Sequence, residues 1–183
     1  MAKLAAEVYG EALFDLAVET DSVDAWAEQI KTAELAFAEN PEFLELLTHP
    51  TITKEEKLSV VEAVFKGRVD DAVTGLLTVI VEKGRCAEIP AVFTLFLDKV
   101  REYRKIGVAS VVSATELSAE QKKRIEDKLL SQTKYESFEM QFDTDASLIG
   151  GMVIRIGDRV VDASIKSKIE RMAASLSKLQ LSV

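Results

Sequence analysis

The chain has 183 residues, 48% of them hydrophobic and 30% charged, and a net charge of −8. Its single cysteine excludes a disulfide framework, and no apolar run approaches the roughly 20 residues that cross a bilayer. The whole acidic excess lies in residues 1–105, which hold 12 basic and 20 acidic residues. A surface of that sign repels phosphate backbones, so nucleic acid is not an expected ligand and a basic protein segment is favoured. Solubility alone would also explain the charge.

The first part of the chain has the pattern of short helices joined by tight turns. We expect helices at residues 4–19, 24–39, 42–48, 54–66, 69–83 and 89–104, separated by proline, glycine and capping residues. The fourth helix begins with a capping box, in which Thr53 precedes Glu56 by three residues. The fold class is therefore mainly α, with a six-helix bundle in residues 1–105.

The second part, residues 106–183, changes period and predicts a small α/β domain. A β-branched run at 108–114 predicts a strand, and Ser118 with Gln121 begins a helix. Alternation of apolar and polar residues at 138–143 predicts a half-buried strand. Residues 152–156 and 160–161 predict a hairpin across Gly157-Asp158. A final helix carries apolar residues at 4-3-4-3 spacing: Ile165, Ile169, Met172, Leu176 and Leu179.

The sequence lacks the groups that an enzyme of this size needs. The only histidine, His49, lies beside Pro50 at a helix end and is expected to be a surface or capping residue. Cys86 has no general base near it in sequence and is expected to be a buried or inert thiol. Neither a phosphate-binding glycine motif nor a nucleophile elbow is present. We therefore predict no catalytic residue, no metal site and no cofactor.

The first and fifth helices are more apolar than a surface helix requires. In residues 4–19 the carboxylates form one narrow stripe, and apolar residues cover an arc of roughly 200° where a stripe of about 100° would face a core. Residues 69–83 likewise carry an apolar arc that is wider than a core requires. Either both helices are central in the bundle, or one face lines a groove for an incoming amphipathic helix, which Gly10 and Ala12 would let come close.

Three stretches resemble the delta subunit of bacterial F-type ATP synthases, the family that includes the mitochondrial oligomycin-sensitivity-conferring protein. The first is VYGEALFDLA at residues 8–17, followed by Trp26. The second is EKGR at 82–85, where Lys83 departs from the family's Glu-Asn-Gly-Arg turn. The third and most specific is LIGGMVIRIGDRVVDAS at 148–164. The resemblance covers essentially the whole chain.

This resemblance implies a stator subunit that keeps the catalytic head from turning with the rotor. Residues 1–105 would bind the N-terminal helix of an alpha subunit between the first and fifth helices, and residues 106–183 would bind the b subunits of the peripheral stalk. The implied alpha contacts are Tyr9, Ala12, Leu13, Val73, Leu76, Leu77 and Ile80. The stalk-side signature comprises Gly150, Gly151, Arg155, Gly157 and Asp158.

The same resemblance implies one copy per complex, with no nucleic acid partner and no insertion into the membrane. The expected location is the cytoplasmic face of the bacterial inner membrane; Met1 and the lack of a transit segment favour a bacterial over a chloroplast source. Two alternatives stay open at this point. One is a helical regulatory adaptor or RNA-associated bundle, which salt-dependent RNA binding would support. The other is a small enzyme whose functional groups converge only in the fold.

Overall fold

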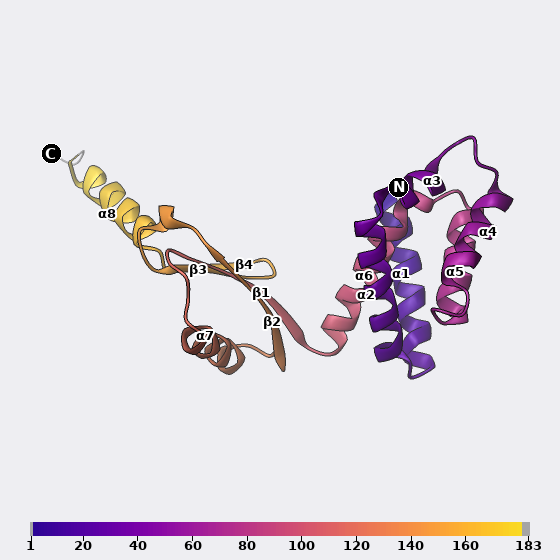
Figure 1. Cartoon of the computed structure of the whole chain (residues 1–183). Coiled ribbons are helices and arrows are strands. Elements are labelled where there is room, and N and C mark those ends of the chain that lie inside the picture. The colour runs from indigo at the N-terminus through magenta and orange to yellow at the C-terminus, as the bar shows by residue number, and fades with distance from the viewer. Residues whose placement is uncertain (1, 181–183) are drawn as a thin grey trace. The chain divides into compact units, whose positions relative to one another are not determined.

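The computed structural model describes residues 2–180, and side chains within residues 6–175. The chain divides into two compact units, Met1–Arg101 and Glu102–Val183 (Figure 1), each with its own hydrophobic core. The boundary falls inside the last helix of the first unit, slightly before the expected seam between residues 105 and 106.

Six α-helices and one short 3-10 helix make up the described part of the first unit, which confirms the expected bundle. They are α1 (Ala2–Glu19), α2 (Val23–Glu39), α3 (Pro41–Thr48), α4 (Lys54–Phe65), α5 (Asp71–Glu82), η1 (Cys86–Glu88) and α6 (Ile89–Tyr103).

Side-chain caps fix where α4 and α5 begin. The Glu56 amide donates to the Thr53 hydroxyl at 3.3 Å, and the Thr53 amide donates to the Glu56 carboxylate at 3.0 Å, so the expected capping box is confirmed. The Thr53 amide and the Thr53 hydroxyl both donate to the Glu56 carboxylate, and these two bonds lower the pKa of Glu56. The Asp70 carboxylate accepts from the Ala72 amide at 3.0 Å, so α5 begins two residues later than expected.

Aromatic rings join α2, α4 and α6 in the core of the bundle. The Phe37 ring stacks on the Phe65 ring at a centroid distance of 6.0 Å and meets the edge of Phe93 at 5.8 Å. Trp26 on α2 belongs to the same buried cluster. Such contacts supply the apolar burial that stabilises the bundle.

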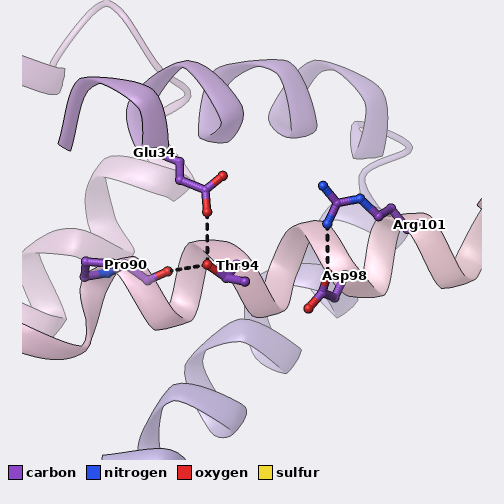
Figure 2. Close-up of polar contacts among 5 residues, drawn as sticks. All are labelled: Glu34, Pro90, Thr94, Asp98 and Arg101. Carbon is purple, nitrogen blue, oxygen red and sulfur yellow. Dashed lines mark hydrogen bonds and ion pairs between the residues drawn. The ribbon is translucent and has the colours of Figure 1, made fainter. Parts of the chain in front are cut away.

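A polar contact also connects α2 to α6 (Figure 2). The Thr94 hydroxyl donates to the Glu34 carboxylate at 2.9 Å and to the Pro90 carbonyl, one turn earlier on its own helix, at 3.0 Å. One turn further along α6, Arg101 and Asp98 form an ion pair at 2.8 Å.

In its described part, the second unit is a four-stranded sheet with two α-helices and one short 3-10 helix. Its elements are β1 (Ile106–Ser113), α7 (Ala119–Gln132), β2 (Ser137–Thr144), η2 (Ala146–Leu148), β3 (Met152–Ile156), β4 (Arg159–Asp162) and α8 (Ile165–Gln180). The strand order is β2-β1-β3-β4, with β1 and β2 parallel and the other pairs antiparallel. Because parallel neighbours need a crossover connection, α7 carries the chain from the end of β1 back to the start of β2.

One face of the sheet packs against α7. Leu129 of α7 is buried against Ala109 of β1 and Phe138 of β2. The register places Met140 beside Ala109, and the predicted alternation along β2 is confirmed, because Phe138 is buried and Met140 half-buried while their neighbours are exposed. The side chains of Leu176 and Leu179 lie outside those the structure describes.

Candidate partner-binding surfaces

One row of α1 faces the core of the bundle. Ala6, Gly10, Leu13 and Ala17 are buried and recur at 4-3-4 spacing. A Cβ on Gly10 would overlap the side chain of Leu95 on α6. The expectation that Gly10 admits a visiting helix was therefore wrong, because this glycine lets α6 come close to α1.

A second apolar row of α1 faces solvent. Val8 is 59% exposed and Leu16 is 40% exposed, with the exposed Ala12 midway between them. Tyr9 is half-buried and packs against the core cluster, so it lies where the inner and outer rows meet. The surplus apolar surface that the sequence predicts on this helix is present.

The helix α5 also carries one buried and one outer apolar row. Val73, Leu77 and Ile80 are buried in the core. Beside them Leu76 is half-buried, and Val79 is 40% exposed. With the half-buried Ala72, the last two form an outer row at 4-3 spacing. The helices α1 and α5 are in contact with each other.

The seven residues expected to bind the alpha helix therefore have different positions. Leu13, Val73, Leu77 and Ile80 are enclosed by this chain, so they hold α1 and α5 in the bundle and offer no surface. Tyr9 and Leu76 are half-buried, and Ala12 is exposed. The apolar side chains that stay partly or fully exposed in the two outer rows are Val8, Ala12 and Leu16 on α1, and Ala72, Leu76 and Val79 on α5.

Carboxylates border the outer row of α1. Asp15 and Glu19 are exposed, and so is Glu11, whose carboxylate lies 3.3 Å from the ammonium group of Lys99. This exposed ion pair contributes little to stability. The acidic border instead favours a partner that carries basic residues beside its apolar face.

In the second unit, Gly150 and Gly151 form a close joint between β3 and α8. The Ile165 amide donates to the Gly150 carbonyl at 2.9 Å, and a Cβ on Gly150 would overlap the Ile165 side chain. Gly151 has φ +80°, and a Cβ there would overlap the Ala163 carbonyl. Both glycines are thus explained by backbone packing.

The remaining signature residues lie at the β3–β4 hairpin. Gly157 has φ +53°, which suits the tight turn that was expected, and Asp158 is exposed beside it. The guanidinium of Arg155 donates to the Gly157 carbonyl at 3.3 Å. These residues shape the hairpin. The five signature residues together do not form a cluster of chemically reactive groups.

Asp162 is an anchoring residue that the sequence reasoning missed. Its carboxylate accepts from the Ser167 hydroxyl at 2.5 Å and from the Ser164 amide at 2.8 Å, which ties β4 to the first turn of α8. The Ser167 hydrogen bond, followed by those from Ser164, lowers the pKa of Asp162 to about 2. An aspartate two residues before a serine at a helix start is the signal that could have found it.

Comparison with known proteins settles the family. The family model for the ATP synthase delta (OSCP) subunit matches residues 5–176. The chain belongs to the ATP synthase delta (OSCP) subunit family. The ATP synthase subunit delta of Lachnoclostridium phytofermentans is 55% identical over 181 residues, which cover 99% of this chain and all of the relative. That of Shewanella woodyi is 36% identical, covering 93% of this chain and 95% of the relative.

A solved structure supports the fold. A chain in the cryo-EM structure of the Toxoplasma gondii mitochondrial ATP synthase hexamer aligns with a TM-score of 0.71 at 23% identity, over 93% of this chain and 96% of that chain. As a member of the ATP synthase delta (OSCP) subunit family, the chain is a structural component of the peripheral stalk of an F-type ATP synthase and not a catalytic subunit. This excludes the adaptor and enzyme alternatives.

The positions of the histidine and the cysteine in this delta-family subunit are consistent with a structural role. His49 is exposed, with its Nδ1 atom 2.7 Å from the Thr51 hydroxyl. Cys86 is buried, and burial raises the pKa of its thiol against a smaller opposing effect of Lys57. Among the described residues, no group of three or more histidine, cysteine or acidic side chains could hold a metal. None of the described helices combines the length and hydropathy that a membrane span requires.

Proposed function

We propose that this chain links the catalytic head of the ATP synthase to the peripheral stalk. The first unit binds the N-terminal helix of an alpha subunit along the outer rows of α1 and α5. The second unit binds the b subunits of the stalk. One copy serves each complex, at the cytoplasmic face of the bacterial inner membrane.

The observation that carries the proposal is the apolar surface left over after the bundle has closed its core. Two neighbouring helices each present an outer apolar row, at spacings of three and four residues, beside the buried one. An amphipathic helix places its own apolar residues at the same spacing, so it can lie along both rows at once. The carboxylates beside the α1 row favour basic residues at the edge of that helix.

A stator link needs affinity and stiffness and has no need of turnover. For a contact with a dissociation constant of about 1 nM, the free energy of dissociation would be roughly 12 kcal/mol. Binding through two units adds effective concentration, because one bound end keeps the other near its own site. The division of the chain into two compact units suits attachment at two ends.

The test is a titration of the full-length chain with a fluorescently labelled peptide that carries the alpha N-terminus. Leu16→Asp and Val79→Asp should each weaken binding at least tenfold, because each places a carboxylate in a contact that excludes water. The matched control is Leu35→Asp on α2, where the leucine is 57% exposed but belongs to neither row. Trp26 fluorescence gives a second readout.

Equal affinity of Leu16→Asp, Val79→Asp and the unmodified chain, with all of them folded by circular dichroism, would remove the assignment of the head contact to these rows. Equal weakening by Leu35→Asp would point to a general effect of added charge instead.

A further inference from the structure

Two hollows on the second unit join into one groove between α7 and the strands β3 and β4. The first has a volume of about 560 Å³ and the second about 770 Å³. They share Leu129, Gln132 and Val161, so they adjoin each other between α7 and β4. The groove runs from Gly151 and Ala163 at one end to the Gly157-Asp158 turn at the other. We call it the α7–β4 groove.

The groove exists because a single helix covers one face of a four-stranded sheet. Strands lie about 4.8 Å apart, so the outer strands are separated by about 14 Å, whereas a helix with its side chains is about 10 Å wide. The helix α7 packs on β2 and β1, at one side of the sheet. The side chain of Val161, on the outermost strand β4, is left 57% exposed. The part of the face over β4 is therefore left uncovered by α7.

The chemistry of the groove is apolar inside and basic at its border. Its apolar lining comes from α7, β3 and β4: Ile125, Leu129, Met152, Ile154, Ile156 and Val161. Four cationic side chains line the two hollows, namely Arg124, Lys128, Lys134 and Arg159. Of these four, Arg124 already forms an ion pair with Glu120 at 2.7 Å, and the carboxylate among the lining residues is that of Asp158. Such a border is complementary to an acidic helix.

The charge of the helix α8 of the same chain is not complementary to this basic border. Its described side chains include Lys166, Lys168 and Arg171 but one carboxylate, Glu170, so its charge has the same sign as that of the groove. Its first turn is held by Asp162 at the end of β4 that adjoins Gly151 and Ala163. Like charges across a contact are costly, so α8 is disfavoured as the occupant.

We propose that the α7–β4 groove holds one α-helix of the peripheral stalk, with an apolar face toward β3 and β4 and acidic residues along its edges. The inference rests on the proposed function of the second unit and names the surface and the chemistry of that contact. The helix would lie beside α7 as a second helix on the same face of the sheet. The cations of α7 and Arg159 of β4 would border its two sides.

Neighbouring residues of β4 offer a matched pair of variants. Val161 pairs with Ile154 and shares its face, whereas Val160 pairs with Arg155 on the opposite face. The two valines are almost equally exposed, at 57% and 58%. The probe is the water-soluble part of the b subunit from the same organism, labelled and titrated with the full-length chain. Val161→Glu should weaken binding at least tenfold, and Val160→Glu should change it less than twofold.

The charge at the border is tested separately. Lys128→Glu should weaken binding severalfold at low salt, and the difference should shrink as salt screens the contact. Equal binding by Val161→Glu and Val160→Glu, with the unmodified chain still bound, would overturn the groove and leave the proposed stalk link standing. Failure of the unmodified chain to bind the b subunit would remove the stalk link, and with it this inference.

A double variant tests whether α8 fills the groove instead. Val161→Cys with Ile169→Cys places one thiol in the groove and one on the exposed face of α8. We expect no disulfide between them in the free chain under mild oxidation. Rapid and complete disulfide formation there would show that α8 occupies the groove and would overturn the proposal.

Discussion

The Ile165 amide nitrogen lies 2.9 Å from the Gly150 carbonyl oxygen and donates to it, which joins the first turn of α8 to the residues before β3. Around this bond, Gly151 approaches the Ala163 backbone, and Asp162 holds Ser164, just before α8, and Ser167 in its first turn. The signature segment thus fixes the direction in which α8 leaves the sheet. The same segment supplies one wall of the α7–β4 groove, because Met152 and Ile154 lie in its lining.

Two glycines of this segment separate the effect of backbone strain from that of crowding. Gly157→Ala, at φ +53° with open space around it, should cost about 1 kcal/mol through strain alone. Gly151→Ala, at φ +80° against the Ala163 carbonyl, should cost about 3 kcal/mol or more, because crowding adds to strain. Urea unfolding of the second unit, followed by circular dichroism, measures both. Equal losses at the two positions would contradict the close approach.

Asp162 predicts a pH dependence with a definite sign. Its pKa of about 2 in the folded chain lies below the ordinary value of about 3.9, so folding favours the ionised form. Its stabilising contribution is therefore complete above about pH 5 and is lost as the pH falls toward 2. The free energy of unfolding of Asp162→Asn should approach that of the unmodified chain over this range. An NMR titration of the Asp162 carboxyl group with a midpoint near pH 4 would contradict the hydrogen bonds that this carboxylate accepts from Ser164 and Ser167.

Local features of the fold could be predicted from the sequence, because they depend on residues close together in the chain. The capping boxes at Thr53 and Ser118 are confirmed, since each needs a hydroxyl and a carboxylate or amide three residues apart. The period of two at 138–142 likewise predicted β2. The parallel pairing of β1 with β2 did not follow, because alternation specifies which face is buried and not which strand lies alongside.

The candidate head contact could be predicted from the sequence only in part. Sequence periodicity revealed that α1 and α5 carry an apolar arc wider than a core requires. It did not reveal which part of the arc faces inward, because that depends on helices distant in the chain. Leu13 and Leu16 lie three residues apart in one apolar arc, yet the first is 2% and the second 40% exposed. The position of Leu95, 85 residues after Gly10, similarly decided the role of that glycine.

Leu13 and Leu16 should therefore respond differently to truncation. Leu13→Ala opens a cavity in the core and should lower the free energy of unfolding by about 2–5 kcal/mol. Leu16→Ala should lower it by less than about 1 kcal/mol and should weaken binding of the alpha peptide severalfold. Urea unfolding and the peptide titration, performed on both variants, give the two comparisons. A Leu16→Ala variant as unstable as Leu13→Ala would place Leu16 in the core and contradict its assignment to the outer row.

The two compact units predict that the bundle folds without the sheet. The buried cluster of the first unit extends from Ala6 to Val100, so a fragment of residues 1–105 retains all of it together with the whole of α6. The fragment loses the ion pair of Lys105 with Glu136, which is exposed and contributes little. It should therefore unfold cooperatively, at the urea midpoint of the bundle in the full chain. A fragment ending at residue 95 loses Phe96 and Val100 from the core and should be largely unfolded. If residues 1–105 were also unfolded, the bundle would depend on the second unit for its stability.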